Sequence, residues 1–515
     1  MPACHQRAAS AVLIHVALLG VALPLAAPTW AQSVPDPTLE QQRIQQREDA
    51  ERRRLEPNPE VRLEAPAAPQ PGHLPDSESP CFPIHAVRWA YAQADAAVAA
   101  WEPWLDTALA GPKGDDGPIG RCIGAAGARI LQERAQNALL RRGYTTSRVL
   151  VEAQDLSGGE LRLTILPGRI HAIRLAEPEN PRATLWNALP LKAGDILNLR
   201  DLEQGLENLK RVPSADADIK IEPAGAGPGE TPLGPAESDV VVTYTQGMPL
   251  RLAAGVDDSG TQATGKYQGS VTVFYDNALT LNDAFYFSLN HDLGSSGGHG
   301  THGHTAHYEI PWGYWLLGLT ASQYNYDQTI AGATIPIIYS GEGASNEIAL
   351  SRVLQRDARG KTTLGLKGWQ RTANNAINGT EVGVQRRIEG GWELALERSQ
   401  AIGSASLAGR IAYKKGTGAF GALHAPEELF GEGTSRFGLW KTDLTLNAPF
   451  KLGGQLLRYS GAWRGQFNTT RLTPLDQFAI GGRYTVRGFD GERQLAAERG
   501  WVWRNDLGWF VGNTG

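Results

Sequence analysis

The sequence has no marked excess of charge of either sign. Its 515 residues include 49 Lys and Arg against 54 Asp and Glu, which gives a formal net charge of −5. Proteins that bind nucleic acid depend on a strongly basic surface, so this balance argues against a nucleic-acid partner. The length allows two to four domains.

Long apolar runs are also missing, with one exception at the N-terminus. Arg7 precedes a mostly apolar run over residues 11–27, and Thr29-Trp30-Ala31 follows that run. This pattern is typical of a secretory signal peptide, residues 1–31, cleaved after Ala31. No later window approaches the roughly 20 apolar residues that a membrane helix needs, which excludes a helical integral membrane protein.

Cysteine is rare as well. Of three cysteines, Cys4 lies in the signal segment, so an exported mature chain keeps only Cys81 and Cys122. An even number of cysteines in an exported protein predicts a disulfide between them. Two unrelated buried thiols are the alternative.

Residues 32–55 include a predicted polar helix at 36–55. This stretch is rich in Gln, Glu and Arg, and its few apolar residues are Leu39, Ile44 and Leu55. A helix without an apolar stripe cannot dock on an ordinary core, so it is either solvated or held in a wet cavity. The next segment, 56–80, holds seven prolines and is predicted to be a stiff extended linker.

Two tandem α/β modules are predicted after the linker, over residues 81–168 and 169–246. Each has the order β-α-α-β-β, with helices that cover one face of the sheet. In the first module we expect elements at 83–90, 94–109 with a break at Pro103, 125–142, 149–154 and 160–166. In the second we expect them at 171–175, 182–189, 198–211, 217–222 and 238–246. Such sheets leave edges to which an extended peptide can add as a strand.

From residue 247 to 515, apolar and polar residues alternate in segments of about 10 residues, a length that fits a transmembrane β-strand. The apolar members of two such segments are Val271, Val273, Tyr275, Phe285, Phe287 and Leu289. With aromatic residues such as Trp312 and Trp315 at segment ends, the pattern is typical of a transmembrane β-barrel. A soluble β-sandwich gives the same alternation, but the signal peptide favours the membrane. We count about 13 candidate strands. That number is one too many if the loop around Arg487 lies at the outer end of the barrel and the chain enters at the opposite end. We therefore expect one of the predicted strands to be wrong.

That loop joins two strand-like segments, 456–467 and 501–510. It contains the sequence Gly481-Gly482-Arg483-Tyr484-Thr485-Val486-Arg487-Gly488-Phe489-Asp490-Gly491. If Arg487 is packed inside a barrel, its guanidinium requires a carboxylate or carbonyl partner. A surface arginine in a glycine-rich turn is the alternative.

Motifs from three regions of the chain resemble one family. They are Cys81-Phe82-Pro83-Ile84, Arg121-Cys122-Ile123-Gly124, Ser351-Arg352-Val353-Leu354, Gly416-Thr417-Gly418 with Pro426-Glu427-Glu428, and Val486-Arg487-Gly488-Phe489 before Arg499-Gly500-Trp501. In this order they resemble the outer-membrane transporters of two-partner secretion, the haemolysin-activator type. The resemblance covers essentially the whole mature chain.

The resemblance implies a plug helix at 32–55, a linker, two periplasmic polypeptide-transport-associated (POTRA) domains at 81–168 and 169–246, and a 16-stranded barrel at 247–515. It also implies that a loop at 468–498 folds back into the barrel, with Val486, Arg487, Gly488 and Phe489 as its functional residues. Gly481, Gly482, Arg483, Tyr484 and Asp490 would support them. In the family the arginine pairs with an acidic residue on a later strand. This sequence ends 28 residues after Arg487, so we expect that partner and the last strands to be absent from it.

The implied function is export of a large unfolded exoprotein, a haemolysin or adhesin encoded nearby, from the periplasm to the cell surface. The implied partners are that exoprotein and outer-membrane lipid, with no cofactor. A general barrel-assembly factor is the first alternative, but such factors usually carry more than two periplasmic modules. An outer-membrane enzyme and a passive porin are further alternatives.

Histidines and paired carboxylates are the two kinds of residue cluster that could carry chemistry. His299, His302, His304 and His307 could bind zinc or copper, but they spread over a Gly- and Thr-rich loop without cysteine, so we expect no metal site. Asp257-Asp258 and Glu427-Glu428 are adjacent carboxylates, which point to different sides and share no substrate. We therefore expect no enzyme activity.

Overall fold

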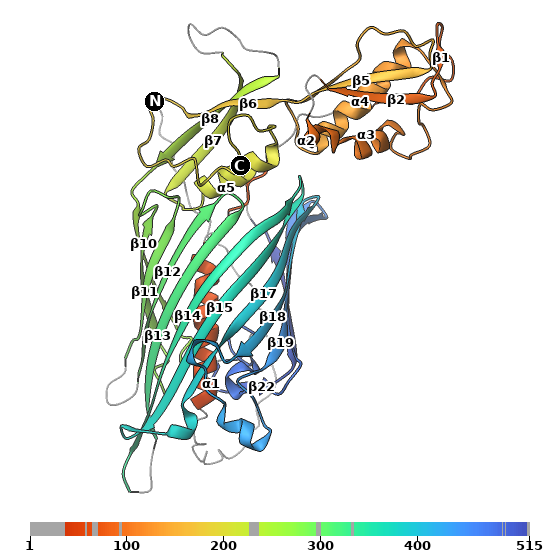
Figure 1. The fold of residues 1–515 in the computed structure, drawn as a ribbon. Coiled ribbons are helices and arrows are strands. Elements are labelled where there is room, and N and C mark those ends of the chain that lie inside the picture. The colour runs from red at the N-terminus through yellow and green to blue at the C-terminus, as the bar shows by residue number, and fades with distance from the viewer. Residues whose placement is uncertain are drawn as a thin grey trace.

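The computed structural model describes residues 37–56, 59–63, 71–91, 95–225, 236–294, 300–330, 334–486, 488–489 and 491–511. Its largest part is a 13-stranded antiparallel sheet that curves into a barrel wall (Figure 1). Two α/β modules lie beyond one end of the wall, and helix α1 (Pro37–Leu55) lies inside it. None of the helices in these ranges is long and apolar enough to cross a membrane.

The first module is a three-stranded sheet covered by helices. Its sheet has the order β2-β5-β4, with β2 (Ala86–Tyr91), β5 (Glu160–Leu166) and β4 (Arg148–Leu150). Its other elements are β1 (Phe82–Pro83), α2 (Ala96–Ala99), α3 (Glu102–Leu109), β3 (Cys122–Ile123) and α4 (Ala125–Arg141). The helix expected at 94–109 breaks at Ala100 and Trp101 rather than at Pro103. Pro103 lies in the first turn of α3, where its missing N–H costs nothing.

The end of the linker is docked on this module. Leu74 is 3% exposed in the module's core, and its amide donates to Asp116 at 3.0 Å. Burial raises the pKa of the Asp116 carboxyl, but the bonds from Leu74 and Arg134 outweigh burial and hold that pKa below its ordinary value. The stabilisation from Asp116 is therefore present above the ordinary carboxyl pKa and is lost in stronger acid. Glu78 accepts from the amides of Ala126 (2.9 Å) and Gly127 (2.8 Å) and so caps α4.

The second module has the strand order β6-β8-β7, with β6 (Arg169–Leu175), β8 (Glu237–Gln246), β7 (Ala215–Pro223) and helix α5 (Leu199–Leu209). The helix expected at 182–189 is wrong, because these residues form turns. Their polar side chains bond to the barrel instead. Arg182 donates to the Asn277 carbonyl, and Asn187 donates to the carbonyls of Leu281 (2.7 Å) and Pro311 (3.1 Å).

The barrel wall is a meander in which each long strand pairs with the next. Its strands are β9 (Leu250–Asp257), β10 (Gln268–Asp276), β11 (Ala284–Asp292), β12 (Gly300–Trp312), β13 (Trp315–Ile330), β14 (Ile337–Arg356), β15 (Gly360–Ile377), β17 (Arg387–Ile402), β18 (Ala405–Thr417), β19 (Gly438–Leu452), β20 (Gln455–Asn468) and β23 (Gly500–Trp509). The two-residue β16 (Thr380–Glu381) pairs with β15. Among the described residues, β9 and β23 are the end strands of this sheet.

The count of about 13 long strands was one too many. The wall has twelve long strands, and the first of them, β9, starts at the end next to the modules. Successive strands alternate in direction, so the eleventh, β20, ends at the opposite end, which we call the far end. The connection between β20 and β23, residues 469–499, therefore begins there. We call it the long loop. It includes the short strands β21 (Phe478–Ile480) and β22 (Leu495–Ala497), which pair with each other.

The wall has an apolar outer face and a polar inner face. Outward side chains such as Leu252, Val271, Leu366 and Leu394 are exposed on the outer face. Because successive strand residues face opposite sides, their neighbours line the lumen. Charged inner side chains of adjacent strands pair there, as Arg410 does with Glu393 at 2.5 Å.

Cys81 and Cys122 form a disulfide that fastens β1 to β3. We predict that Cys81→Ala together with Cys122→Ala lowers the free energy of unfolding of the first module by about 3 to 4 kcal/mol, since the loop between them is then unrestricted in the unfolded chain. Pulse proteolysis of the intact chain in urea measures this change. An unchanged urea midpoint for the first module would mean that its core holds without the bond.

Candidate functional site

Helix α1 is the main occupant of the lumen (Figure 1). Most of its side chains are Gln, Glu and Arg, so apolar packing cannot hold it in place. Ile44 is the exception: it is 2% exposed and packs against Tyr324, Tyr326 and Tyr339 of the wall.

Polar contacts hold α1 to the wall along its length. Near the far end, Glu40 accepts from the Thr264 hydroxyl at 2.8 Å. Near the module end, Arg52 pairs with Glu347 of β14 at 2.9 Å. Between them, Gln41 donates to Asn375 of β15 at 3.3 Å.

Further contacts join α1 to the long loop. Gln42 donates to the Gln477 carbonyl at 3.3 Å, and Gln46 donates to the Ala479 carbonyl at 3.1 Å. Arg43 donates to the Gly491 carbonyl at 2.5 Å. The helix therefore touches the wall and the loop at once.

The long loop is fastened to the wall by Asp476. Its carboxylate, 7% exposed, accepts from Arg371 of β15 at 2.9 Å and from Lys414 of β18 at 3.0 Å. Glu389 of β17 also pairs with Arg371, and it accepts from the Thr473 hydroxyl of the loop at 3.0 Å. Two buried carboxylates are thus balanced by two cations whose side chains are 12% exposed. We call Asp476, Arg371, Lys414 and Glu389 the loop anchor.

The anchor also reaches the helix, because Arg371 donates to Gln45 of α1 at 3.2 Å. At the base of the loop a second set of bonds brings its two ends together. Arg499 donates to Asn468, Asn468 donates to Glu498 at 2.8 Å, and Glu498 accepts from the Leu472 amide at 3.1 Å.

Four of the residues predicted to support the functional loop, Gly481, Gly482, Arg483 and Tyr484, lie in a tight turn. The Thr485 hydroxyl accepts from the amides of Gly481 (3.1 Å) and Gly482 (3.2 Å), and Val486 N donates to the Gly482 carbonyl at 3.1 Å. Gly481 has a φ of +113°, a conformation that favours glycine. Arg483 lies in the same turn.

Arg483 connects this turn to the end of β9. It pairs with Asp258 at 2.5 Å and lies 3.8 Å from Asp257, so these adjacent carboxylates contact the loop. Tyr484 is half-buried. Gly488 has a φ of +91°, and Phe489 is 57% exposed.

Arg487 and Asp490 lie outside the described residues, and the roles predicted for them stay predictions.

The second carboxylate pair has a structural place too. Glu427 pairs with Arg387 of β17 at 2.7 Å. Glu428 accepts from the Ser435 amide at 3.1 Å and from the Thr434 hydroxyl at 2.8 Å, which folds the connection between β18 and β19. The two side chains therefore serve different contacts.

The histidines of β12 do not converge. His302 and His304 are on the outer face, whereas His307 is on the inner face, where it bonds to the Thr320 hydroxyl at 2.9 Å. His299 lies outside the described residues. Within the described ranges, no group of three or more metal-ligating side chains is found.

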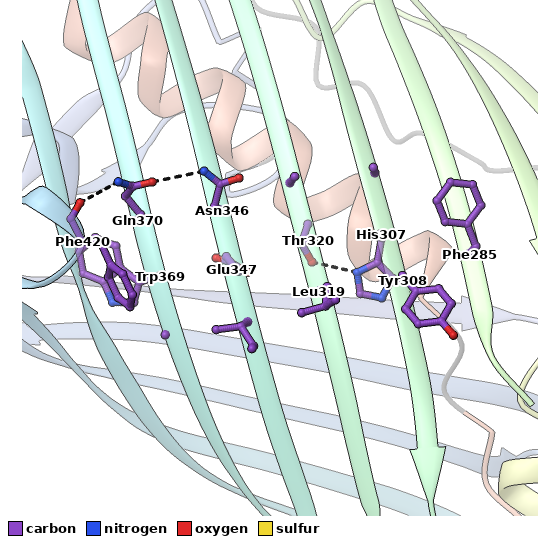
Figure 2. A pocket seen from close by; sticks show the side chains of 14 residues that line it. Phe285, His307, Tyr308, Leu319, Thr320, Asn346, Glu347, Trp369, Gln370 and Phe420 are labelled. Carbon is purple, nitrogen blue, oxygen red and sulfur yellow. Dashed lines mark hydrogen bonds between the residues drawn. The ribbon is translucent and has the colours of Figure 1, made fainter. Parts of the chain in front are cut away.

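A hollow of about 400 Å³ lies at the wall along β11 to β15 (Figure 2). Gln370 links two of the residues that line it: its side chain accepts from Asn346 at 3.3 Å and donates to the Phe420 carbonyl at 2.8 Å. Its acidic residue, Glu347, is already paired with Lys367 at 3.2 Å. His307 also lines it and bonds to the Thr320 hydroxyl at 2.9 Å. The charged and imidazole groups of the hollow therefore already have partners in the wall.

The loop anchor was not predicted from the sequence. Arg371, Glu389 and Lys414 are charged residues at inward positions of alternating strands, and each requires a partner if buried. That requirement was a usable signal. The partners themselves depend on which strands meet across the lumen.

We predict that Asp476→Asn releases the long loop, because Arg371 and Lys414 lose a buried counter-charge. Breaking such a pair costs about 3 to 5 kcal/mol. The loop of the purified protein should then be cleaved by added protease at least about tenfold faster, provided the loop must leave the anchor to be cut. Glu432→Gln, an exposed carboxylate between β18 and β19, is the matched control. Equal cleavage rates for the two variants would show that Asp476 does not hold the loop.

Comparison with known proteins gives one consistent assignment. The family model for haemolysin secretion/activation protein ShlB/FhaC/HecB matches residues 236–514. A POTRA domain model matches residues 169–223, and a ShlB-type POTRA model matches residues 116–168.

Individual relatives agree with this assignment. The chain is 37% identical over 482 residues to the outer membrane transporter CdiB-2 of Burkholderia pseudomallei (strain 1026b), covering 92% of this chain and 80% of the relative. It is 24% identical over 459 residues to the hemolysin transporter protein ShlB of Serratia marcescens, covering 89% and 77%. The solved structure of CdiB from Acinetobacter baumannii matches with a TM-score of 0.80 at 31% identity, covering 94% of this chain and 87% of that one.

The barrel with an inner helix, the two modules and these matches agree. They identify a transporter rather than an enzyme, placed in the outer membrane with its POTRA domains in the periplasm. The chain belongs to the haemolysin secretion/activation family ShlB/FhaC/HecB, the outer-membrane transporters of two-partner secretion that export a partner exoprotein.

Proposed function

We propose that this chain exports one large exoprotein of the haemolysin or adhesin type, encoded near its own gene, as an extended chain through the lumen that α1 occupies at rest. The observation that carries the proposal is the way α1 is held. It lies inside the barrel on polar contacts to the wall and to the long loop, with Ile44 as its one fully buried apolar side chain in the described part of the helix.

Such contacts suit a helix that has to leave. A hydrogen bond that is exchanged for one with water changes the free energy by only about 0.5 to 1.5 kcal/mol. Charges of the lumen wall pair with one another, as Glu347 does with Lys367, so they keep partners when the helix withdraws. An extended polypeptide with polar main-chain groups would meet the same wet surface in its place.

The POTRA domains would receive the exoprotein. Within the described residues, β2 pairs only with β5, so its other edge has free main-chain groups. An extended segment could add there as a further strand. Folding of the exoprotein outside the cell would then draw the chain outward.

We assign residues 1–31 to a signal peptide, 32–55 to the plug, 56–80 to the linker, and 81–168 and 169–246 to the two POTRA domains. The barrel begins at 247, and residues 468–498 form the loop that carries Val486, Arg487, Gly488 and Phe489.

Deleting residues 37–55 should raise the single-channel conductance of the purified protein in planar bilayers, because the helix no longer fills the lumen. Arg54→Ala is the control, since this side chain of α1 is exposed. A deletion variant with the conductance of the intact chain would place α1 outside the conducting path.

Arg487→Ala should abolish export while the transporter stays in the outer membrane, since we assign this cation to a desolvated charge pair that costs about 3 to 5 kcal/mol to break. Arg487→Lys should restore export only in part, because an ammonium lacks the planar fork that matches a carboxylate. The gene used must encode every strand of the barrel. Arg471→Ala, at an exposed arginine of the same loop, is the matched control. Normal export by Arg487→Ala at equal abundance would make Arg487 an ordinary surface arginine.

A further inference from the structure

Three linker residues, Val61, Arg62 and Leu63, lie on helix α5 of the second POTRA domain. The Val61 amide donates to Glu207 at 3.0 Å, and the Leu63 amide donates to Glu203 at 2.7 Å. Both carboxylates are buried, with exposures of 2% and 0%. A buried carboxylate needs partners, and here main-chain amides are among them.

The spacing of this contact has a simple physical basis. Glu203 and Glu207 are one turn apart on α5, a rise of about 6 Å along the helix. Two residues of an extended chain span about 6.6 Å. Alternate amides of an extended segment therefore meet successive carboxylates on one face of the helix.

The carbonyls of the same residues are held too. Arg356, from the periplasmic end of β14, donates to the Val61 carbonyl, and Arg200 of α5 donates to the Leu63 carbonyl at 3.5 Å. Arg356 also pairs with Glu203 at 3.0 Å, so a barrel residue completes this binding site for the linker. We call the site the seat. Both main-chain groups of both residues are thus taken by side chains.

The side chains add little sequence selectivity. Val61 and Leu63 are partly buried against the core of the second POTRA domain. Arg62 between them is exposed and pairs with Glu60. The seat requires an extended backbone with two apolar side chains at alternate positions, and any segment with that pattern satisfies it.

We propose that this seat on α5 binds extended polypeptide with apolar side chains at two alternate positions. The linker fills it at rest, and an extended stretch of the exoprotein takes its place during export. The identity of the second occupant rests on the proposed function.

Displacement of residues 61–63 from the seat would loosen the end of the plug helix α1. Only six positions separate Leu55, the last residue of α1, from Val61. While 61–63 are seated, this short tether keeps the end of α1 at the mouth of the barrel. A segment that displaces the linker frees that end of the helix.

The test uses the mature full-length chain carrying Val61→Cys, with maleimide labelling of the new thiol as the readout of linker release. The probe is the peptide acetyl-Glu-Val-Arg-Leu-Glu-amide at about millimolar concentration, which matches the effective concentration of a short tether. If the linker is seated about nine-tenths of the time, labelling should accelerate about fivefold.

Two methylated peptides separate main-chain recognition from other effects. Methylation of the Val and Leu amide nitrogens removes both donors and should abolish the acceleration. Methylation of the Arg nitrogen should leave it unchanged. Equal acceleration by all three peptides, or by none, would overturn the site.

The exoprotein supplies the last comparison. Its unfolded N-terminal part should bind the chain and accelerate labelling as the parent peptide does. Binding without acceleration would overturn the proposed competition at α5. A failure to bind at all would instead count against the proposed function, because the peptide result does not depend on export.

Discussion

The charges inside the barrel have to be compensated there, and the loop anchor is where this constraint joins the most parts of the molecule. Arg371 and Lys414 come from two strands of the wall, Asp476 comes from the long loop, and Glu389 balances the set. Gln45 of α1 contacts the same arginine. A change in the position of the loop or of the helix therefore changes the surroundings of the same buried ions, which is a physical reason for the two to move together.

The same principle operates at the periplasmic end. Glu203 and Glu207 of α5 are matched by Arg200, Arg356 and Lys361 from the POTRA domain and the barrel turn. Linker amides complete their bonding. The plug helix and its linker are thus bound to two charge clusters, one in the lumen and one at the barrel mouth. Each cluster holds an amide group by hydrogen bonds that water or another polypeptide can replace. The helix can therefore be held in place at rest and still be released.

Much of the fold could be predicted from local patterns. The alternation of Val271 and Val273 with polar neighbours predicted which face of β10 points outward, because the side-chain period of a strand is two. The lack of an apolar stripe predicted that the helix at 36–55 lies in wet surroundings. Outside the predicted signal peptide, the sequence has only two cysteines that could pair.

Other features depend on contacts between distant segments and could not be predicted in this way. Residues 182–189 have a helix-like composition, but Arg182 and Asn187 bond to barrel turns, and these bonds decide their conformation. Asp476 meets Arg371 and Lys414 only because the long loop folds into the lumen against the inner faces of β15 and β18. The seat of Val61 and Leu63 on α5 likewise joins segments about 140 residues apart, whose proximity no local pattern encodes.

The central claim is that α1 must leave the lumen for the exoprotein to pass, and a reversible cross-link tests it most directly. Gln41 of the helix donates to Asn375 of the wall strand β15, so thiols at Gln41→Cys and Asn375→Cys lie within reach of a short bis-methanethiosulfonate reagent, which joins them through reducible disulfides. Export is measured in cells treated with this reagent and again after mild reduction, with the parent chain treated identically. The account predicts that export stops when the cross-link is complete and resumes on reduction. Export at the parental rate with the cross-link complete would contradict it.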